Sequence, residues 1–505
     1  NEDGASYTVK GIGKATDVTD LVVFSEYNGL PVTKIASNAF RNCDNLQSVC
    51  LYGIETISSD AFVSCVNVEK LILPDTLSGI AGLRFNSHVL KEIEIDSANP
   101  KYYVENNCLI EKEQKILRVG CTQSIIPADG SVRVIGPHAF ATRNITEIDI
   151  PNTVIRIGEN AFLGCDFTEL EIPSSVTVIV DGAFSWCSEL TKLTLSEGLK
   201  EIGTDAFGNC SALKEVEIPS SVFEIGDNVF MGCTSLSSIK MHDGVETIGW
   251  RAFKDSALTE IIIPKTVKEI GNMLFWNCDK LTSITVESGN TVYHSAGNCI
   301  IETATKTLKV GCNGSVIPDD GSVTEIGNYA FMYCKFTEIS MPDSVTKIGT
   351  SAFEHCENLQ EVPLTGNIEV IGSNAFSCCY GLVNVVIPDG ITYISGFDYC
   401  LNLESVTISE SVKSIVTAFE GCKKLKTVNI PSGVTSILAS FMGCESLESI
   451  TIPGSVETIG AMTFDGCTSL KKVIVEEGVQ QINSSAFRDC TSLEEITLPK
   501  SFLPE

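Results

Sequence analysis

The sequence has no apolar run that approaches the roughly 18 residues needed to cross a bilayer. It is also poor in basic residues, because 35 Lys and Arg stand against 64 Asp and Glu, for a formal net charge of −29. A nucleic-acid-binding face must be basic to neutralise phosphates, so general nucleic-acid binding is excluded and docking to anionic lipid is disfavoured. No signal-like segment occurs, and any secretion signal or membrane anchor is expected to lie outside this sequence.

Motifs of common enzymes are also missing. No G-x-S-x-G, H-E-x-x-H or Gly-rich phosphate loop stands in a supporting context. Carboxylates on an open face lack the burial that tunes pKa values for catalysis. The few histidines are scattered, at His88, His138, His242, His294 and His355. We therefore predict a protein that is not an enzyme and that uses no cofactor or metal.

The chain instead contains a repeat. Its pattern is IP-x-S-V-x-x-I-G-x-x-A-F-x-x-C-x-x-L-x-x-I, and its Phe recurs every 21 to 23 residues except across two gaps of 55 and 56. Such a fixed period is the signature of stacked coils, each of which buries its apolar side against its neighbours. The repeat Phe are Phe40, Phe62, Phe85, Phe140, Phe162, Phe184, Phe207, Phe230, Phe253, Phe275, Phe331, Phe353, Phe376, Phe397, Phe419, Phe441, Phe464 and Phe487.

Each coil contains a short strand with the leucine-rich-repeat pattern L-x-x-L-x-L. In one coil, Leu193 and Leu195 alternate with Lys192 and Thr194, so the leucines point inward and the polar residues outward. No 3.6-residue stripe persists across a coil, so the return path is expected to consist of turns and short 3₁₀ pieces. The predicted fold is a mainly β, right-handed curved solenoid with little α-helix. Its parallel inner sheet has about 21 short strands, from near Leu21–Val23 to near Ile496–Leu498.

Cysteine is abundant, and 15 of the 21 Cys lie three residues after a repeat Phe. A metal site needs two to four converging ligands, whereas each coil contributes one thiol that points the same way as its neighbours. A free Cys behaves as a small buried hydrophobe, so we predict an internal ladder of reduced thiols. The ladder positions are Cys43, Cys65, Cys165, Cys187, Cys210, Cys233, Cys278, Cys334, Cys356, Cys379, Cys400, Cys422, Cys444, Cys467 and Cys490.

The two long gaps hold matched inserts, DSANPKYYVENNCLIEKEQKILRVGC and ESGNTVYHSAGNCIIETATKTLKVGC. Each insert is predicted to form a hairpin followed by one more coil strand. The hairpins pair Cys108–Glu111 with Ile116–Val119 and Cys299–Glu302 with Leu308–Val310, and the further strands are Ile125–Ile126 and Val316–Ile317.

Four Cys lie in these inserts at equal separations. Period-2 pairing of the hairpin strands sets Cys108 opposite Cys121 and Cys299 opposite Cys312. Directly opposed Cys allow a disulfide, and a marginal two-stranded hairpin gains most from one. The alternative is two pairs of buried thiols that were duplicated together.

The repeat IPSSVxxIGxxAFxxCxxLxxI, the start YTVKGIG…YNGLPVTKIASNAF and the NPKYY…LRVGC insert resemble the BspA-like leucine-rich repeats of bacterial surface proteins. The resemblance covers nearly the whole chain. It implies a secreted or surface-displayed protein of host-associated bacteria, with a role in adhesion or matrix-protein binding and without enzyme activity. The family offers no fixed binding motif that can be carried over to individual residues.

Acidic residues gather at the exposed strand positions of the N-terminal half. A solvated face of an acidic protein explains them, as does a footprint for a basic ligand. Calcium is a third possibility, but stacked strands do not converge tightly enough for its six to eight oxygen ligands. The candidate ligand-binding residues are Glu92, Glu94, Glu147, Asp149, Glu169, Glu171, Glu215 and Glu217.

We therefore expect a non-enzymatic surface or secreted binding protein, an adhesin-like module that uses its inner sheet face and hairpin inserts. Its partner is expected to be a host or bacterial surface protein, possibly basic, with no nucleic acid, no membrane insertion within this chain, and a monomeric state. The alternative is a passive spacer that presents another segment at the cell surface. The expected organisation is a capping segment at 1–39, repeats at 40–95, 123–286 and 314–505, and inserts at 96–122 and 287–313.

Overall fold

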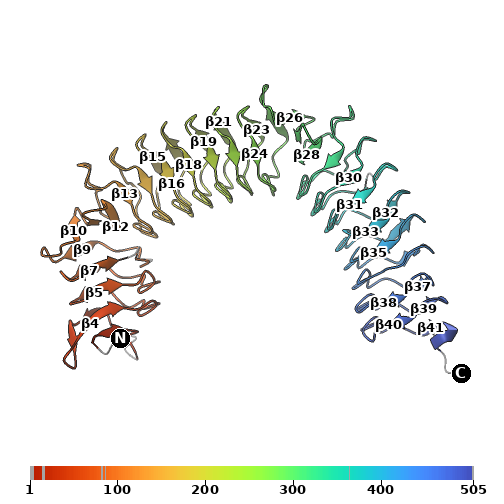
Figure 1. The fold of residues 1–505 in the computed structure, drawn as a ribbon, viewed down its shortest axis with the longest axis horizontal. Helices are drawn as coiled ribbons and strands as arrows, with labels where there is room; N and C mark the ends of the chain where they lie inside the picture. The colour runs from red at the N-terminus through yellow and green to blue at the C-terminus, as the bar shows by residue number, and fades with distance from the viewer. Residues whose placement is uncertain (1–4, 14–16, 81–82, 86, 363, 503–505) are drawn as a thin grey trace. The chain divides into compact units, whose positions relative to one another are not determined.

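The computed structural model describes residues 5–13, 17–80, 83–85, 87–362 and 364–502. Residues 1–4 and 14–16 of the predicted capping segment thus lie outside the described residues. The chain folds as two units, unit 1 (Asn1–Leu258 with Glu269–Gly271) and unit 2 (Thr259–Lys268 with Asn272–Glu505). Both units are stacks of coils, and the fold is a β-solenoid of about 21 coils (Figure 1). The predicted solenoid of parallel strands is confirmed.

The L-x-x-L-x-L segments form the first of two parallel ladders. In most of its strands buried and solvent-facing residues alternate. In β15, for example, Leu170 and Ile172 are buried, whereas Glu169 and Glu171 are exposed. The first ladder consists, in unit 1, of β2 (Asp20–Val23), β5 (Ser48–Leu51), β7 (Lys70–Leu73), β9 (Glu92–Ile95), β15 (Glu169–Ile172), β17 (Lys192–Leu195), β19 (Glu215–Ile218) and β21 (Ser238–Met241), and in unit 2 of β23 (Glu260–Ile263), β25 (Ser283–Val286), β32 (Asn384–Ile387), β34 (Ser405–Ile408), β36 (Thr427–Val428), β37 (Ser449–Ile452), β39 (Lys472–Val475) and β41 (Glu495–Thr497).

A second parallel ladder runs along the return path of the coils. The expected return by turns and 3₁₀ pieces was therefore wrong in part, because the x-I dipeptide before each repeat Gly pairs with its counterpart in the next coil. Its strands are, in unit 1, β4 (Leu30–Ile35), β6 (Thr56–Ile57), β8 (Gly79–Ile80), β13 (Val134–Ile135), β14 (Arg156–Ile157), β16 (Val178–Ile179), β18 (Glu201–Ile202), β20 (Glu224–Ile225), β22 (Thr247–Ile248) and β24 (Glu269–Ile270), and in unit 2 β29 (Glu325–Ile326), β30 (Lys347–Ile348), β31 (Val370–Ile371), β33 (Tyr393–Ile394), β35 (Ser414–Ile415), β38 (Thr458–Ile459) and β40 (Gln481–Ile482). The two ladders run alongside each other in Figure 1.

Other regular structure is sparse. At the N-terminal end, β1 (Tyr7–Val9) pairs parallel to β4 and β3 (Glu26–Tyr27) pairs antiparallel to it. A short 3₁₀ helix, η1, spans Lys500–Phe502, and the described residues form no α-helix. No helix of the described segments is therefore long and apolar enough to cross a membrane.

The repeat Phe form a stack of rings within each unit. Phe140 and Phe162 stack with centroids 5.0 Å apart and planes 2° apart, and Phe353 stacks on Phe376 at 5.2 Å and 2°. These rings are fully buried, and parallel aromatic pairs contribute beyond their buried area. The Phe stack is therefore the central apolar column of each unit.

The repeat Cys bind the coils to one another through their thiols. Cys210 donates its S–H to the carbonyl of Phe184 in the preceding coil at 3.3 Å, and Cys379 donates to Phe353 O at 3.2 Å. The same bond is made by Cys65, Cys165, Cys187, Cys233, Cys356, Cys400, Cys422, Cys444, Cys467 and Cys490. The repeated Cys is thus explained by a backbone carbonyl that needs a small buried donor.

Burial also makes these thiols unreactive. It raises the pKa of Cys65 and of Cys233 to about 12, so at pH 8 about one molecule in ten thousand carries the reactive thiolate at either position. We expect iodoacetamide to label quickly only the partly exposed thiols of the folded protein, and the rest only after denaturation. Peptide mass mapping checks this, and labelling of Cys233 as fast as that of Cys50 would contradict it. The partly exposed thiols are Cys43, Cys50, Cys378 and Cys490.

The first ladder is interrupted after each insert. Residues 145–150 and 336–341 occupy strand positions in the repeat but form no strand. The strands predicted at Ile125–Ile126 and Val316–Ile317 are also absent, because the amides of Ile125 and Val316 bond to the insert turns instead of to a neighbouring coil. The inserts therefore replace part of the first ladder.

Candidate binding surface

The eight predicted carboxylates all lie exposed on the first-ladder side of unit 1, at Glu92, Glu94, Glu147, Asp149, Glu169, Glu171, Glu215 and Glu217. We call this set the acidic strand face. Strands β9, β15 and β19 carry six of them at outward positions, and the segment 145–150 carries the other two. The period-2 alternation that predicted their exposure is the alternation that the strands show.

Lysines of neighbouring coils neutralise part of this face. Lys70 Nζ lies 3.0 Å from Glu92 Oε2 and 2.6 Å from Glu94 Oε1. Lys192, which is paired in register with Glu169, places its Nζ 3.1 Å from Glu169 Oε2. The stacking of like charges that the sequence implied is therefore relieved in part by interleaved lysines.

Glu217 is contacted by a lysine and a histidine. Its Oε1 lies 2.7 Å from Lys240 Nζ and 2.7 Å from His242 Nε2. The hydrogen bond from Lys240, and then that from His242, lowers the pKa of Glu217. The role of His242 was missed in the sequence because this residue lies one position beyond the strand, where alternation gives no information.

A groove of about 510 Å³ opens on the acidic strand face over β17, β19 and β21. Of these strands, β17 and β19 belong to separate sheets. The groove is lined by carboxylates, lysines and other polar side chains, among them Lys192, Thr194, Glu215, Glu217, Lys240 and His242. An extended polar segment of a ligand is the kind of group that this groove accommodates.

Four carboxylates of the face keep their charge without a cationic partner. Within the part of the chain that the structure describes, no ion pair reaches Glu147, Asp149, Glu171 or Glu215. Exposed ion pairs contribute little to stability, but free exposed carboxylates attract cations over about a Debye length. These four residues therefore dominate the attraction of the face for a basic ligand.

Each insert contains three antiparallel strands. In the first insert they are β10 (Tyr102–Glu105), β11 (Cys108–Glu111) and β12 (Ile116–Gly120), and in the second they are β26 (Tyr293–Ala296), β27 (Cys299–Glu302) and β28 (Thr307–Val310). The predicted hairpins are present, preceded by one strand that the sequence did not indicate. The last strand of each insert continues into the second ladder by pairing with β13 or β29.

The predicted register of the first hairpin is wrong. Cys108 faces Gly120 instead of Cys121, and Ile110 faces Leu117 instead of Val119, with a bulge between Leu109 and Ile110. Gly120 leaves no room for a side chain, since a Cβ there would lie 1.9 Å from the ring of Phe140. The residue opposite Cys108 therefore has to be a glycine, and no cysteine faces it.

The second insert repeats the bulge, and all four insert Cys are buried free thiols. Ile300 pairs with Val310 and Ile301 with Leu308. Cys108 donates to the carbonyls of Asn106 and Ile125, and Cys312 donates to Asn298 O at 3.7 Å. Burial raises the pKa of Cys108 and of Cys299 to about 12. The thiols of Cys108, Cys299 and Cys312 are thus hydrogen-bonded to the insert backbone, and Cys121 is a buried free thiol.

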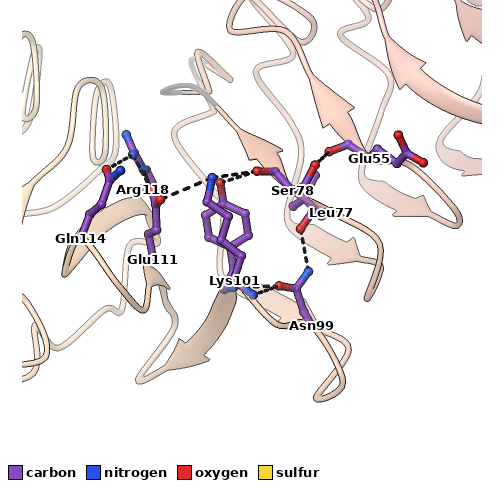
Figure 2. A network of polar contacts seen from close by, with 9 residues as sticks. Glu55, Leu77, Ser78, Asn99, Lys101, Glu111, Gln114 and Arg118 are labelled. Carbon is purple, nitrogen blue, oxygen red and sulfur yellow. Dashed lines mark hydrogen bonds and ion pairs between the residues drawn. The ribbon is translucent and has the colours of Figure 1, made fainter.

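One Asn anchors each insert to the preceding coil, the buried Asn99 in the first insert (Figure 2) and the half-buried Asn290 in the second. Asn99 Nδ2 donates to the carbonyls of Pro74, Asp75 and Leu77 at 2.9–3.1 Å, and its Oδ1 accepts from the amides of Lys101 and Tyr102. In the second insert, Asn290 makes the equivalent bonds to the carbonyls of Pro264 and Val267 and to the amides of Val292 and Tyr293. The two Asn occupy the same place in the two insert sequences, a signal that the sequence analysis did not use.

The first insert also carries a buried ion-pair network that the sequence did not reveal. Figure 2 shows Glu111 between Arg118 and Lys101. Arg118 Nε lies 2.8 Å from Glu111 Oε2, and Lys101 Nζ lies 3.4 Å from Glu111 Oε1 while donating to Ser78 O at 2.8 Å. The glutamate side chain is 2% exposed, so the network ties the insert to the coil before it.

A buried arginine takes the place of the repeat Cys after the first insert. Arg143 is fully buried and donates to the carbonyls of Ser87, Gly120 and Ala141. Burial lowers the pKa of Arg143 to about 10. After the second insert the same position is Cys334, which lines a cavity of about 20 Å³. The larger side chain fills the space that the insert opens between two coils.

The repeats match a known family. The sequence model of the BspA-type leucine-rich repeat region matches residues 27–119, 118–231, 200–321, 324–439 and 395–503. No curated protein matches the chain in sequence. The match to this family model covers nearly the whole solenoid.

Solved structures of bacterial leucine-rich-repeat proteins are similar to this chain. A leucine-rich cell-surface protein from Faecalibacterium prausnitzii is 28% identical, with 80% of this chain and 100% of that chain covered and a TM-score of 0.53. A leucine-rich-repeat protein from Eubacterium ventriosum is 21% identical, with 67% of this chain and 94% of that chain covered and a TM-score of 0.50, and supports the fold alone.

Proposed function

Because the chain belongs to the BspA-type leucine-rich-repeat family, we propose that it is a non-enzymatic adhesin-like protein that binds a basic surface or matrix protein through its acidic strand face. The family is one of bacterial surface proteins, and its repeats favour a role in protein–protein interaction or adhesion. The observation that carries the proposal is the group of four exposed carboxylates without ion pairs, Glu147, Asp149, Glu171 and Glu215.

The proposed ligand is a host or bacterial surface protein with a basic face. Complementary charge steers such a partner to the surface. The groove over β17, β19 and β21 offers carboxylates that accept hydrogen bonds and lysines that donate them. The two inserts border the ladder and supply further contact area. We propose that the protein acts as a monomer at the cell surface or after secretion. The likeness to the F. prausnitzii cell-surface protein supports the surface location.

The proposal is tested by removing the four free charges. A variant with Glu147→Gln, Asp149→Asn, Glu171→Gln and Glu215→Gln is expected to bind purified basic matrix proteins about tenfold more weakly, because each exposed charge contributes about 0.3–0.5 kcal/mol. Surface plasmon resonance with the full chain measures the affinity. The matched control removes four exposed or half-exposed carboxylates from the second-ladder side of unit 1 and should leave the affinity unchanged, with Gln at Glu159, Glu201, Glu224 and Glu269.

A passive spacer is the second candidate function. The ion pairs of Lys70, Lys192 and Lys240 favour it, because they reduce the field of the acidic strand face. If the two variants and the natural chain bind with equal affinity, the acidic strand face does not bind the ligand. Absence of binding to any matrix or bacterial surface protein in the panel would favour the spacer.

A further inference from the structure

Each insert is followed by an aliphatic side chain that is held out in solvent. Ile125 is 70% exposed and Val316 is 66% exposed, whereas the next residues, Ile126 and Ile317, are 4% exposed each. A single exposed aliphatic residue is ordinary on a protein surface. Here the exposed residue recurs at the same place in both copies of the insert, so a common cause has to be sought in the contacts around it.

The backbone at both positions is fixed by the same bond. The amide of Ile125 donates to Asn106 O at 3.3 Å, and the amide of Val316 donates to Gly297 O at 2.8 Å. Both acceptors lie in the turn between the first two strands of the insert. Gly297 is packed so closely that a Cβ there would lie 1.9 Å from Val316 O. The insert turn therefore holds the segment in place from one side.

The preceding serine holds the segment from the other side. Ser124 Oγ donates to Asn107 O at 2.7 Å and accepts from the amide of Cys121 at 2.8 Å. Ser315 Oγ donates to Asn298 O at 2.8 Å and accepts from the amide of Cys312 in the same way. With these bonds in place, neither Ile125 nor Val316 is able to turn inward without breaking buried hydrogen bonds.

The two exposed residues have different electrostatic surroundings. In unit 1, the coil before Ile125 carries Glu94 and the coil after it carries Asp149. In unit 2, the outward residues at the corresponding positions are Thr285 and Ser340, both exposed and neutral. Glu94 is paired with Lys70, so the free charge beside the first position comes from Glu147 and Asp149, whereas Glu338 is the exposed carboxylate beside Ser340 at the second. A basic ligand is therefore attracted more strongly to the first position than to the second.

We propose that Ile125 and Val316 are two docking points with the same backbone support but unequal charge, each of which binds an aliphatic residue of an extended basic segment, so that one chain binds two ligand segments. The proposal rests on the proposed function and adds to it the stoichiometry and the chemistry of the ligand. The matched contacts to the insert turn and to the serine explain why the chain holds these side chains exposed.

The test uses the full chain and a ten-residue peptide with two central Leu flanked by Ser and Lys on both sides. Native mass spectrometry and calorimetry are expected to find two peptides per chain. Ile125→Ser and Val316→Ser should each leave one peptide bound, and the double variant none. The control Val386→Ser, at a residue 63% exposed on β32, should still bind two. Substitutions at such exposed positions change stability by about 0.5 kcal/mol or less, so the variants remain folded.

Salt separates the two docking points. Raising NaCl from about 50 to 300 mM should weaken binding about tenfold in Val316→Ser, which keeps the acidic docking point, and less than twofold in Ile125→Ser. Two peptides still bound to the double variant, or no peptide bound to the natural chain, would overturn the two docking points. If a basic matrix protein then still binds in a manner that depends on the four free carboxylates, the proposed function stands without them.

Discussion

Replacing Phe207 by Ala is expected to lower the free energy of unfolding by about 3–5 kcal/mol, the usual cost of deleting a fully buried aromatic ring. Phe207 is fully buried and stacks on Phe184 at 5.3 Å and on Phe230 at 5.8 Å. The substitution therefore opens a cavity and breaks two ring contacts at once. Coils in a solenoid are stabilised by their neighbours, so the loss extends to the coils on both sides.

Urea denaturation followed by circular dichroism measures this loss, and hydrogen exchange locates it. The matched control is Phe223→Ala, whose ring is 40% exposed and lies outside the stack, with an expected loss of about 0.5 kcal/mol or less. Exchange should accelerate in the coils of Phe184 and Phe230 in the first variant only. Equal destabilisation by the two substitutions would show that the ring stack is not the main apolar column.

Asn99→Ala is expected to cost about 3–5 kcal/mol and to release the first insert from the coil before it. The side chain is 1% exposed and bonds to three carbonyls and two amides, all of which lose this partner on substitution, although Pro74 O still accepts from the amide of Leu77. Each buried polar group without a partner costs about 1–3 kcal/mol, partly recovered where water enters. This is the largest effect that we expect from a single polar substitution in the chain.

The second insert supplies an internal comparison. Asn290 makes one fewer bond to the preceding coil than Asn99, so Asn290→Ala should cost less. Asn152→Ala, at an exposed position, should change stability by about 0.5 kcal/mol or less. Thermal unfolding and limited proteolysis at the insert measure the three variants. If Asn99→Ala is no worse than Asn152→Ala, the anchor does not hold the insert.

The solenoid, the buried Phe and the buried Cys were predictable from the sequence because the same pattern of apolar residues recurs in each repeat. The second ladder was not predicted because all but one of its strands are two residues long, too short for a periodic signal, although the x-I-G triplet recurs in ten of the repeats. The thiol bond from Cys210 to Phe184 was likewise hidden, since sequence spacing shows burial but not which carbonyl accepts.

The inserts show where alternation alone misplaces the register of a hairpin. Period-2 alternation set Cys108 opposite Cys121, but the strands contain a bulge and Cys108 faces Gly120, which packs against the ring of Phe140. For the acidic strand face, alternation predicted which carboxylates are exposed. The lysines that neutralise them were identifiable only from the register between coils, such as Glu169 with Lys192.

The measurement that tests the central claim most directly is the salt dependence of binding to a basic matrix protein, compared between the natural chain and the variant that lacks the four free carboxylates. If the acidic strand face holds the ligand, the affinity of the natural chain should fall by at least about tenfold between 50 and 300 mM NaCl, and that of the variant by much less. Parallel salt dependences of the two proteins would contradict the account, because the charge that responds to salt would then lie elsewhere on the molecule.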